Sequence, residues 1–306
     1  MYKVAVIMST YNGEKYLKEQ IDSILAQNNV DVTIYIRDDG SSDRTVDIIK
    51  EYMETHDNFR LFIGKNMGVG NSFMQVLYSV DKNNDYYAFA DQDDVWLSDK
   101  IEKAIEGIKD LEKPALYCSN QILVDGKLNR IGMRYISNPD VSYRQIVCQN
   151  KISGCTMVWN KELHGFLSKN EFRPSEDLLR KRIHDVWVAM VASVVGMIKY
   201  DIHGYILYRQ HESNVVGVKK TNIIKQWMEK IKDPTQRNGR SAICKEVYSR
   251  YLEKIVDEKV KSDLNLYGNY RQSYYDRMRL AFDYDLIKKT GESRIGYSMK
   301  VLTGLF

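Results

Sequence analysis

The stretch YYAFADQDDVW, residues 86–96, decides the fold of this chain. Five apolar or aromatic residues, Tyr86 to Ala90, are followed at once by three aspartates within four positions. A short continuous apolar run is typical of a strand that is buried on both faces. The acidic run behind it therefore predicts a polar loop at the end of a buried strand.

The same arrangement of an apolar run and a polar turn occurs upstream. Apolar runs alternate with segments in which apolar residues recur at helical spacing, which predicts βαβ units and a parallel sheet. The expected strands cover residues 4–8, 32–36, 60–63 and 86–90, and the expected helices cover 16–25, 46–53 and 71–80. The loops after parallel strands share one edge of the sheet, where ligands bind in open α/β folds.

The pattern is looser in the second half of the chain. We expect a helix at 100–111, a strand at 115–119, an apolar helix at 185–195 and a late strand at 205–209. From residue 221 onward the chain has helical spacing. The sequence thus predicts an α/β domain, residues 1–218, with a mostly parallel central sheet flanked by helices. A helical, basic C-terminal extension, residues 219–306, follows it.

The composition places the chain among globular proteins. It has 306 residues, 43% of them hydrophobic and 28% charged, and no run of 18 apolar residues that predicts a membrane-spanning helix. The segment MYKVAVIMSTYN at the N-terminus resembles a first strand more than a signal peptide. The four cysteines show no CxxC pair, so we expect free buried thiols and a cytoplasmic protein.

The charge is unevenly distributed. The net charge is +4, yet residues 219–306 hold 19 Lys and Arg against 11 Asp and Glu. A basic extension can meet nucleic acid, anionic lipid or an anionic substrate, or can be an ordinary solvated helix surface. We expect contact with an anionic membrane surface and no nucleic acid. The alternative use of these tyrosine-rich helices is a homo-oligomer contact.

The acidic residues form two groups at strand ends. Asp38 and Asp39 end the second strand, and Asp91, Asp93 and Asp94 follow the fourth. Carboxylates gathered at one sheet edge repel one another unless a cation lies between them. Mg²⁺ and Mn²⁺ prefer such oxygen ligands together with substrate phosphates. The competing interpretation of DQDD is a solvated helix cap.

Six motifs together carry a resemblance to a known family. STYNGEKYL (9–17), RDDGSSDRT (37–45) and ADQDDVW (90–96) resemble the N-terminal motifs of family 2 glycosyltransferases, which have the GT-A fold. SGCTMVWNKEL (153–163), HDVWVAMVASVVG (184–196) and YRQHESNVVG (208–217) resemble the bacterial rhamnosyltransferase-like branch of that family, including enzymes of streptococcal rhamnose polysaccharides. The alanine expected after Asn66 and Gly68 in a further family motif is shifted or replaced.

The resemblance implies a role for individual residues. Asp185 matches the catalytic base of inverting members, Asp93 the metal ligand, Asp91 the acid near the ribose and Asp39 the acid that accepts the base imide N–H. A carboxylate at Asp39 selects uracil or thymine, since it needs a donor. The nucleotide-sugar-binding positions implied are Thr10, Tyr11, Asn12, Glu14, Asp38, Asp39, Asn66, Gly68, Asp91, Gln92, Gly154, Trp187, Arg209 and His211. The metal ligands implied are Asp93, Asp91 and His211, with Mn²⁺ or Mg²⁺ as cofactor.

Several of these residues have a structural alternative. Asp185 can stabilise a helix N-terminus, and Trp187, like Trp96, can belong to the core rather than stack on a sugar. His184 can orient a carboxylate or pack. His211 can be an ordinary loop histidine, and Gly154 can mark a turn.

The resulting hypothesis is an inverting glycosyltransferase. The donor favoured by resemblance is dTDP-rhamnose, and the acceptor is a growing glycan on a polyprenyl diphosphate at the inner face of the cell membrane. UDP-galactose, UDP-glucose and UDP-N-acetylglucosamine stay open as donors. A nucleotidyltransferase would bring a Gly- and Arg-rich loop that STYNGEKYL lacks, and a dinucleotide enzyme would have GxGxxG after its first strand. A nucleotide-binding scaffold without catalysis is the third alternative.

Overall fold

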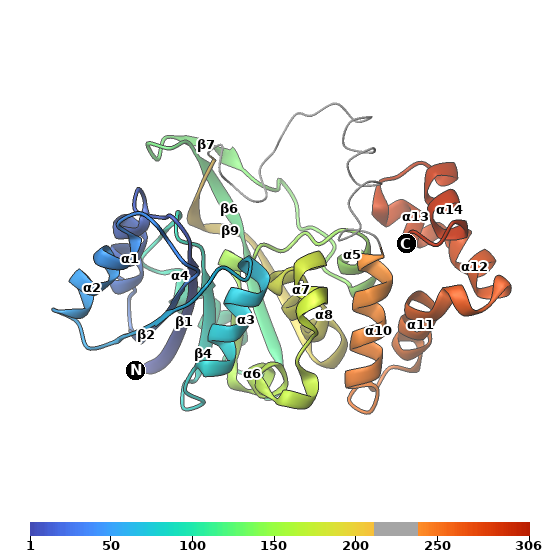
Figure 1. Ribbon diagram of the computed structural model, residues 1–306, viewed down its shortest axis with the longest axis horizontal. Coiled ribbons are helices and arrows are strands. Elements are labelled where there is room, and N and C mark those ends of the chain that lie inside the picture. Colours follow the sequence, from blue (N-terminus) through green and yellow to red (C-terminus); the bar gives the residue numbers. More distant parts are fainter. Residues whose placement is uncertain (211–237) are drawn as a thin grey trace.

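The computed structural model describes residues 1–210 and 238–306. Its centre is a mixed sheet with the strand order β3-β2-β1-β4-β8-β6-β9-β5, and β7 pairs with β6 outside this path. Helices cover both faces, and the last helices lie together at one end of the molecule (Figure 1). The predicted boundary between residues 218 and 219 and the predicted ligand His211 lie outside the described residues.

The N-terminal half of the sheet is parallel. Strands β1 (Tyr2–Thr10), β2 (Val30–Asp38), β3 (Phe59–Ile63) and β4 (Tyr86–Ala90) pair in parallel, in the order β3-β2-β1-β4. They are connected through the helices α1 (Leu17–Leu25), α2 (Thr45–Met53) and α3 (Val69–Ser79). The alternation of strand and helix predicted from the sequence is confirmed here. Because β1, β2 and β4 are parallel, their carboxyl ends reach the same edge of the sheet.

The second half of the sheet is mixed. Its strands are β5 (Val95–Trp96), β6 (Ala115–Val124), β7 (Arg130–Met133), β8 (Val158–Asn160) and β9 (Met197–Arg209). Strand β8 is antiparallel to both β4 and β6, whereas β9 runs parallel to β6. β9 begins eight residues before the expected strand at 205. Lys199, Asp201 and His203 interrupt its apolar pattern, and much of the strand is only half-buried, so no apolar run marks its start.

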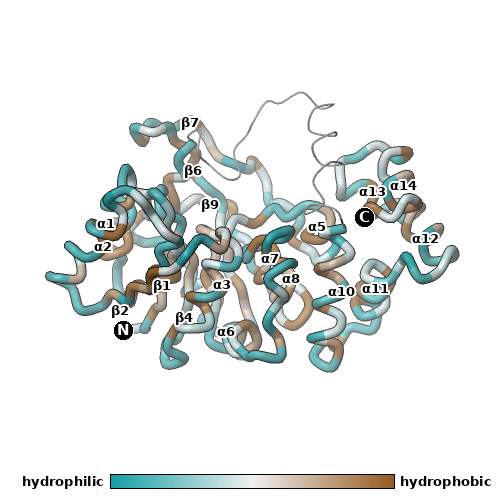
Figure 2. The backbone as a smooth tube through the Cα atoms, viewed as in Figure 1, coloured by the Kyte–Doolittle hydropathy of each residue, from teal (hydrophilic) through white to brown (hydrophobic). Residues whose placement is uncertain are grey.

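Two hydrophobic cores lie on the two faces of the sheet. Along β1, Ala5 and Ile7 face one core, while Val4, Val6 and Met8 face the other. This is the alternation that a strand imposes on successive side chains. Figure 2 shows hydrophobic residues concentrated in β1. The core that contains Val4 is shared with α1, α2 and α4 (Lys100–Ile108).

The core that contains Ala5 extends into the C-terminal helices. It joins α3 and the apolar helix α8 (His184–Val195) to buried side chains such as Tyr251, Tyr267 and Phe306. The other helices between β7 and α8 are α5 (Tyr143–Cys148), α6 (Lys161–Ser168) and α7 (Glu176–Lys181). The C-terminal helices are α10 (Gly239–Tyr251), α11 (Glu258–Asn269), α12 (Tyr274–Ala281), α13 (Tyr284–Thr290) and α14 (Arg294–Leu302). The described part of the predicted extension is thus helical and packs against the sheet domain.

Two further sequence expectations concern the cysteines and the membrane. All four cysteines are free and buried, as predicted. In the described parts of the chain, no helix is both long enough and apolar enough to span a bilayer.

Candidate active site

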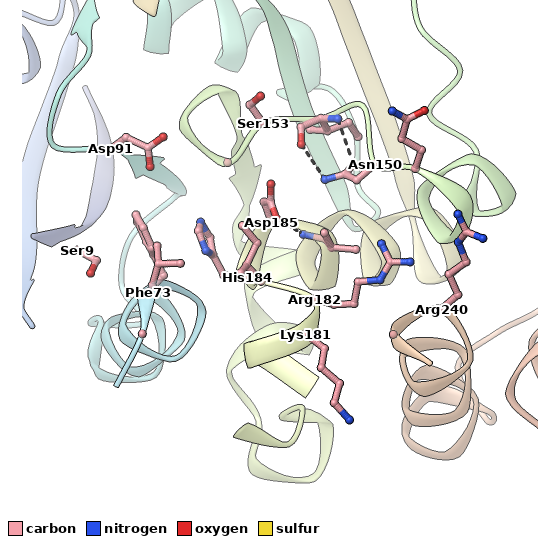
Figure 3. A pocket seen from close by; sticks show the side chains of 18 of the residues that line it. Ser9, Phe73, Asp91, Asn150, Ser153, Lys181, Arg182, His184, Asp185 and Arg240 are labelled. Carbon is pink, nitrogen blue, oxygen red and sulfur yellow. Dashed lines mark hydrogen bonds between the residues drawn. The ribbon is translucent and has the colours of Figure 1, made fainter. Parts of the chain in front are cut away.

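A cavity of about 1330 Å³ opens at the carboxyl edge of the parallel strands. Ser9 and Tyr11 from the end of β1, Asp39 after β2 and Asp91 after β4 line one part of it. Its other walls come from the segment 148–154, the start of α8 and the helices α10 and α14. Figure 3 shows Asp91 on one side of Asp185, and Arg182 and Arg240 on the other.

The end of the cavity nearest the sheet is acidic. Asp91 and Asp93 both line it. Burial, together with the neighbouring carboxylates of Asp93 and Asp185, raises the pKa of Asp91 to about 7. The repulsion expected from the sequence is therefore present in the structure, and a cation between Asp91 and Asp93 would relieve it.

Asp94 and Cys155 lie behind this acidic wall. One ligand atom from each of Asp91, Asp94 and Cys155 falls within 4.8 Å of the others. Asp94 is 1% exposed, and its Oδ2 has no hydrogen-bond partner within the described residues. Burial and the acids Asp94 and Asp91 raise the pKa of the Cys155 thiol well above its usual range, so that side chain is not a ready thiolate ligand.

This donor set fits a hard divalent cation. Within the acidic loop, Asp91 and Asp93 face the cavity, whereas Asp94 is not part of its wall, and neither is Cys155. Oxygen ligands with room for substrate phosphates are what Mg²⁺ and Mn²⁺ prefer. Asp91 and Asp93 would hold such an ion, with Asp94 supporting them from behind.

Lys100 lies beneath the same loop. Its Nζ is 3.6 Å from the centre of the Trp96 ring and has no hydrogen-bond partner within residues 1–210 and 238–306. Burial lowers its pKa to about 7, while Cys155 and Asp94 oppose that shift. Lys100 is thus a buried cation near the acids, which the sequence did not reveal.

Asp185 stands at the first turn of α8 and faces the cavity. Its Oδ1 accepts the backbone N–H of Val186 at 2.6 Å. Burial raises the pKa of Asp185 to about 6, and the cations Arg134 and Arg182 partly oppose that rise. A buried carboxylate with a pKa near 6 is ionised at neutral pH yet basic enough to accept a proton.

His184 and Gly154 form the wall beside Asp185. The His184 ring stacks on Phe73, with centroids 3.9 Å apart, and burial lowers its pKa to about 3. A Cβ at Gly154 would lie 2.8 Å from His184 Nε2, so glycine is required for this approach. Both ring nitrogens lack a hydrogen-bond partner in the described residues. The neutral imidazole is therefore buried with one donor and one acceptor that no described residue satisfies.

The Gln92 side chain links the loop after β4 to the loop after β1 at the acidic end of the cavity. Its side-chain amide donates to the Tyr11 carbonyl at 3.1 Å and accepts the Tyr11 N–H at 2.9 Å. A Cβ at Gly13 would collide with the Gln92 side chain, so the glycine of STYNG allows this bridge. The loops after β1 and β4 are thereby held in one position relative to each other.

Asp39 organises the neighbouring rim. It forms an ion pair with Arg37, and its carboxylate accepts the N–H groups of Met67 and Gly68, each at 3.1 Å. Asn66 accepts the Gly68 N–H at 3.1 Å, and Gly68 has φ +85°, a region that favours glycine. Most of the acceptor capacity of Asp39 is thus already used.

The structure brings most predicted site residues to one cavity. The predicted residues on its wall are Tyr11, Asn12, Asp39, Asn66, Gly68, Asp91, Gln92, Asp93, Gly154 and Asp185. They come from six separate parts of the chain. Their contacts with a nucleotide-sugar stay a prediction.

Other predicted residues do not reach the cavity wall. The Thr10 hydroxyl donates to Asp38, and Asp38 in turn accepts the N–H groups of Gly40 and Ser41, which fixes the turn. Glu14 accepts the Arg44 N–H at 2.9 Å. These side chains shape the loops after β1 and β2 rather than the surface of the cavity.

Two larger predicted residues are also placed elsewhere. Trp187 is 0% exposed and packs 6.1 Å from the Tyr251 ring, which favours its core interpretation. Arg209 is buried, pairs with Glu19 and lies 4.5 Å above the Tyr16 ring. Its backbone N–H contacts Asp94, so it braces the acidic loop from behind.

The sequence missed several cations on the cavity wall. Arg182, Arg240 and Lys300 lie at the end opposite the acids, and Arg134 lies 6.0 Å from the Tyr208 ring. No local motif marks them, because they come from separate segments that only folding brings together. The arrangement as a whole can hold a cation with an anionic ligand at one end and remove a proton at Asp185 in the middle.

Comparisons with known proteins identify the family of the chain. The family described as Glycosyl transferase family 2 matches residues 5–159. The chain is 34% identical over 221 residues to the dTDP-rhamnosyl transferase RfbG of Shigella flexneri, covering 69% of this chain and 73% of that protein. It is 26% identical over 177 residues to the putative teichuronic acid biosynthesis glycosyltransferase TuaG of Bacillus subtilis, covering 57% and 69%.

Solved structures resemble the chain over nearly its whole length. The TarS 1–349 structure from S. aureus covers 98% of this chain and 80% of its own, with a TM-score of 0.58 and 16% identity. The TarS complex with UDP-GlcNAc covers 99% and 93%, with a TM-score of 0.56. At this identity the likeness shows the fold alone. Together with the family match and the relative from Shigella, it establishes that the chain is a glycosyltransferase of family 2, in its rhamnosyltransferase-like branch.

Proposed function

We propose that the protein is an inverting enzyme that moves rhamnose from dTDP-rhamnose onto a growing lipid-linked polysaccharide. The observation that carries the reaction type is Asp185, a buried carboxylate that faces the same cavity as Asp91 and Asp93. The donor rests on the relative RfbG, whose name states a dTDP-rhamnosyl transferase and which covers two thirds of this chain.

The chemistry at Asp185 is a single proton transfer. The acceptor hydroxyl gives its proton to the Asp185 carboxylate as its oxygen forms a bond to the anomeric carbon. The bond from that carbon to the diphosphate breaks on the opposite face, which inverts the centre. A bound Mn²⁺ or Mg²⁺ supplies charge neutralisation to the departing diphosphate. Arg134 and Arg182 keep Asp185 more acidic than burial alone would, so that it is ionised at neutral pH.

The donor-binding role falls to the acidic end and its rim. Asp91 and Asp93 would hold the cation, while Tyr11, Asp39 and Asn66 line the part of the cavity next to them. The nucleobase of the donor would contact the loops that hydrogen bonds of Gln92 and Asp39 hold in place. The rim offers no residue that identifies the thymine methyl, so the alternative donors UDP-galactose, UDP-glucose and UDP-N-acetylglucosamine enter the same experiment.

A donor screen tests this function. We would titrate dTDP-rhamnose, UDP-glucose, UDP-galactose, UDP-N-acetylglucosamine and GDP-mannose by calorimetry, each with Mn²⁺ and with EDTA. We expect metal-dependent binding of dTDP-rhamnose and its slow hydrolysis in the absence of acceptor. Preference for a UDP-sugar would show that the donor is that UDP-sugar rather than dTDP-rhamnose. If no donor binds in a metal-dependent way, the proposed enzyme is overturned and the scaffold alternative is favoured.

The C-terminal helices support a position at the inner face of the cell membrane. Large apolar side chains are exposed along α12 to α14: Tyr274 at 76%, Tyr275 at 72%, Phe282 at 64%, Tyr284 at 63% and Ile295 at 80%. Exposed cations, among them Arg279, Lys288 and Arg294, share these helices. Aromatic rings with cations suit the surface of an anionic bilayer.

Vesicle sedimentation tests this membrane contact. We expect binding to vesicles that contain phosphatidylglycerol, release by added salt and loss of binding on the paired change Tyr274→Ser and Tyr275→Ser. Absence of binding, together with a concentration-dependent dimer in ultracentrifugation, would instead support the homo-oligomer through these helices.

A further inference from the structure

Cations of the described residues gather at the end of the cavity beyond Asp185. Arg182, Arg240 and Lys300 all face it. Glu292 pairs with two of them, accepting Arg240 Nη2 at 3.0 Å and Lys300 Nζ at 2.7 Å. This group, which we call the basic end, therefore contains more positive than negative charge.

Arg182 has no carboxylate partner within ion-pair distance among residues 1–210 and 238–306. Its Nη2 donates only to the Val147 carbonyl, at 2.8 Å. Burial lowers the pKa of Arg182 to about 10, and the nearby guanidinium of Arg240 lowers it in the same direction. Two like charges held together in a partly buried wall destabilise the fold unless an anion joins them.

The backbone at this point also favours an anion. Gly239 begins α10, and a Cβ there would lie 3.2 Å from Arg182 Nε. The glycine thus lets the guanidinium approach the helix N-terminus. The side chain of the N-cap residue, Asn238, makes no capping hydrogen bond with a described residue. The N–H groups of a helix N-terminus attract negative charge, and here they lie beside the three cations.

The position of the basic end separates it from the donor. Asp91 lies on one side of Asp185, while Arg182 and Arg240 lie on the other (Figure 3). In a displacement that inverts the reacting carbon, the attacking and leaving oxygens stand on opposite faces. The diphosphate of the donor belongs to the acidic side, where the cation is expected. The basic end is therefore on the side from which the acceptor arrives.

We propose that Arg182, Arg240 and Lys300 form a binding site for an anionic group of the acceptor, a phosphate or a carboxylate. The proposal rests on the proposed transferase function. It adds to that function a defined place for charge on the acceptor. Arg182 and Arg240 can each present two N–H groups to such an anion, which is the strongest geometry for this recognition.

The wall beyond the cations indicates which anion is favoured. Met299 and Leu305 line the same end of the cavity and are 55% and 37% exposed. Phe306 lies beside them, with Arg240 5.7 Å from its ring. A cationic site that continues into exposed apolar side chains suits a diphosphate attached to an apolar chain better than the carboxylate of an acidic sugar.

Calorimetry on the metal-free protein tests the site directly. With EDTA present, we would titrate inorganic diphosphate, farnesyl diphosphate and glucuronate into wild type, Arg182→Gln and Arg240→Gln. Matched controls are Arg180→Gln and Arg250→Gln, since Arg180 on α7 pairs with Asp177 and Arg250 on α10 pairs with Glu246. We expect at least tenfold weaker anion binding in the first two variants and none of this loss in the controls.

The three ligands distinguish the sources of the anion. Tighter binding of farnesyl diphosphate than of inorganic diphosphate supports a lipid-linked acceptor, and preferential binding of glucuronate supports an acidic sugar. Failure of the wild type to bind any of the three, or equal affinity in Arg182→Gln, overturns the site. Lys300→Met provides an independent variant if the loss of the contact with Val147 unfolds Arg182→Gln.

Donor hydrolysis separates this inference from the proposed function. We expect Arg240→Gln to bind dTDP-rhamnose with Mn²⁺ and to hydrolyse it as wild type does, while its KM for a lipid-linked acceptor rises at least tenfold. Arg240→Lys is expected to restore part of that loss. If wild type uses the donor but binds no anion, the proposed transferase function stands and the anion site is overturned. If wild type binds the anion but no donor, the anion site stands and the proposed transferase function is overturned.

Discussion

The two ends of the cavity differ in charge and in origin. The acidic end is formed by loops that directly follow neighbouring parallel strands, within residues 9–93. The basic end is assembled from the residue after α7 and from α10 and α14. A site at a sheet edge therefore has a local sequence signature, a buried strand followed by polar residues, while a site between helices has none.

The two ends share one physical property. Burial and like charges raise the pKa of Asp91 and lower the pKa of Arg182, so each end holds charges that are unfavourable without a ligand. Asp185 lies between them and is influenced by both, since it raises the pKa of Asp91 and is itself influenced by Arg182. We therefore expect the donor to bind at the acidic end and the acceptor to bind at the basic end.

The largest expected effect is at Asp185, where the two ends meet. Asp185→Asn keeps the shape but cannot take a proton, so transfer is expected to fall by about 10²–10⁴, the usual contribution of a general base. Calorimetry is expected to show unchanged donor binding. Asp177→Asn, an exposed acid on the preceding helix, is the matched control. Normal turnover by Asp185→Asn would show that the base lies elsewhere.

The second largest effect is expected on metal-dependent donor binding at the acidic end. Asp93→Ala removes a cavity-facing carboxylate, and we expect donor binding with Mn²⁺ to weaken by about 10- to 100-fold, the range seen when metal sites are perturbed. EDTA is expected to remove the difference between the variant and wild type. Asp99→Ala, outside the cavity, serves as the control. Equal metal dependence in Asp93→Ala would place the ion at other ligands.

A smaller effect concerns the pH dependence of transfer. The pKa of Asp185 is raised to about 6, and the reaction needs its ionised form. With saturating donor, kcat is expected to fall as pH drops through about 6, and to be about tenfold lower one unit below that pKa. Removing one opposing cation with Arg182→Gln is expected to move this acid limb to higher pH. An acid limb near pH 4 would contradict the raised pKa.

The smallest effect is on stability at the acidic end. The folded-state pKa of Asp91 is raised to about 7, above the ordinary value of 3.8, so its stabilising contribution is complete below pH 3.8 and is lost as pH rises through 7. In metal-free protein at pH 8, Asp91→Asn is therefore expected to raise Tm by a few degrees. The gain is expected to disappear towards pH 4, and to be absent with the control Asp99→Asn. A lower Tm at pH 8 would contradict the burial of repelling charges.

Much of the fold and half of the cavity follow from local sequence. Residues 4–8, 32–36 and 86–90 read as strands because a strand buried on both faces has no polar position. The long strand β9 was recognised only at its end, because half-buried strands with Lys199 and Asp201 have no such run. The sequence also does not show which of two adjacent acids faces the cavity. Asp38 accepts hydrogen bonds from its own turn, while Asp39 lines the cavity.

The βαβ order, the acidic loops and the aspartate at the start of an apolar helix follow from local sequence, because each depends on neighbours within one turn or one strand. The choice of side chains that face the cavity depends on tertiary packing. In the folded chain, Asp93 lines the cavity whereas Asp94 does not. Packing also places His184 in contact with Gly154, and Arg182 near Arg240. These contacts join residues that are distant along the chain, and packing alone determines their approach.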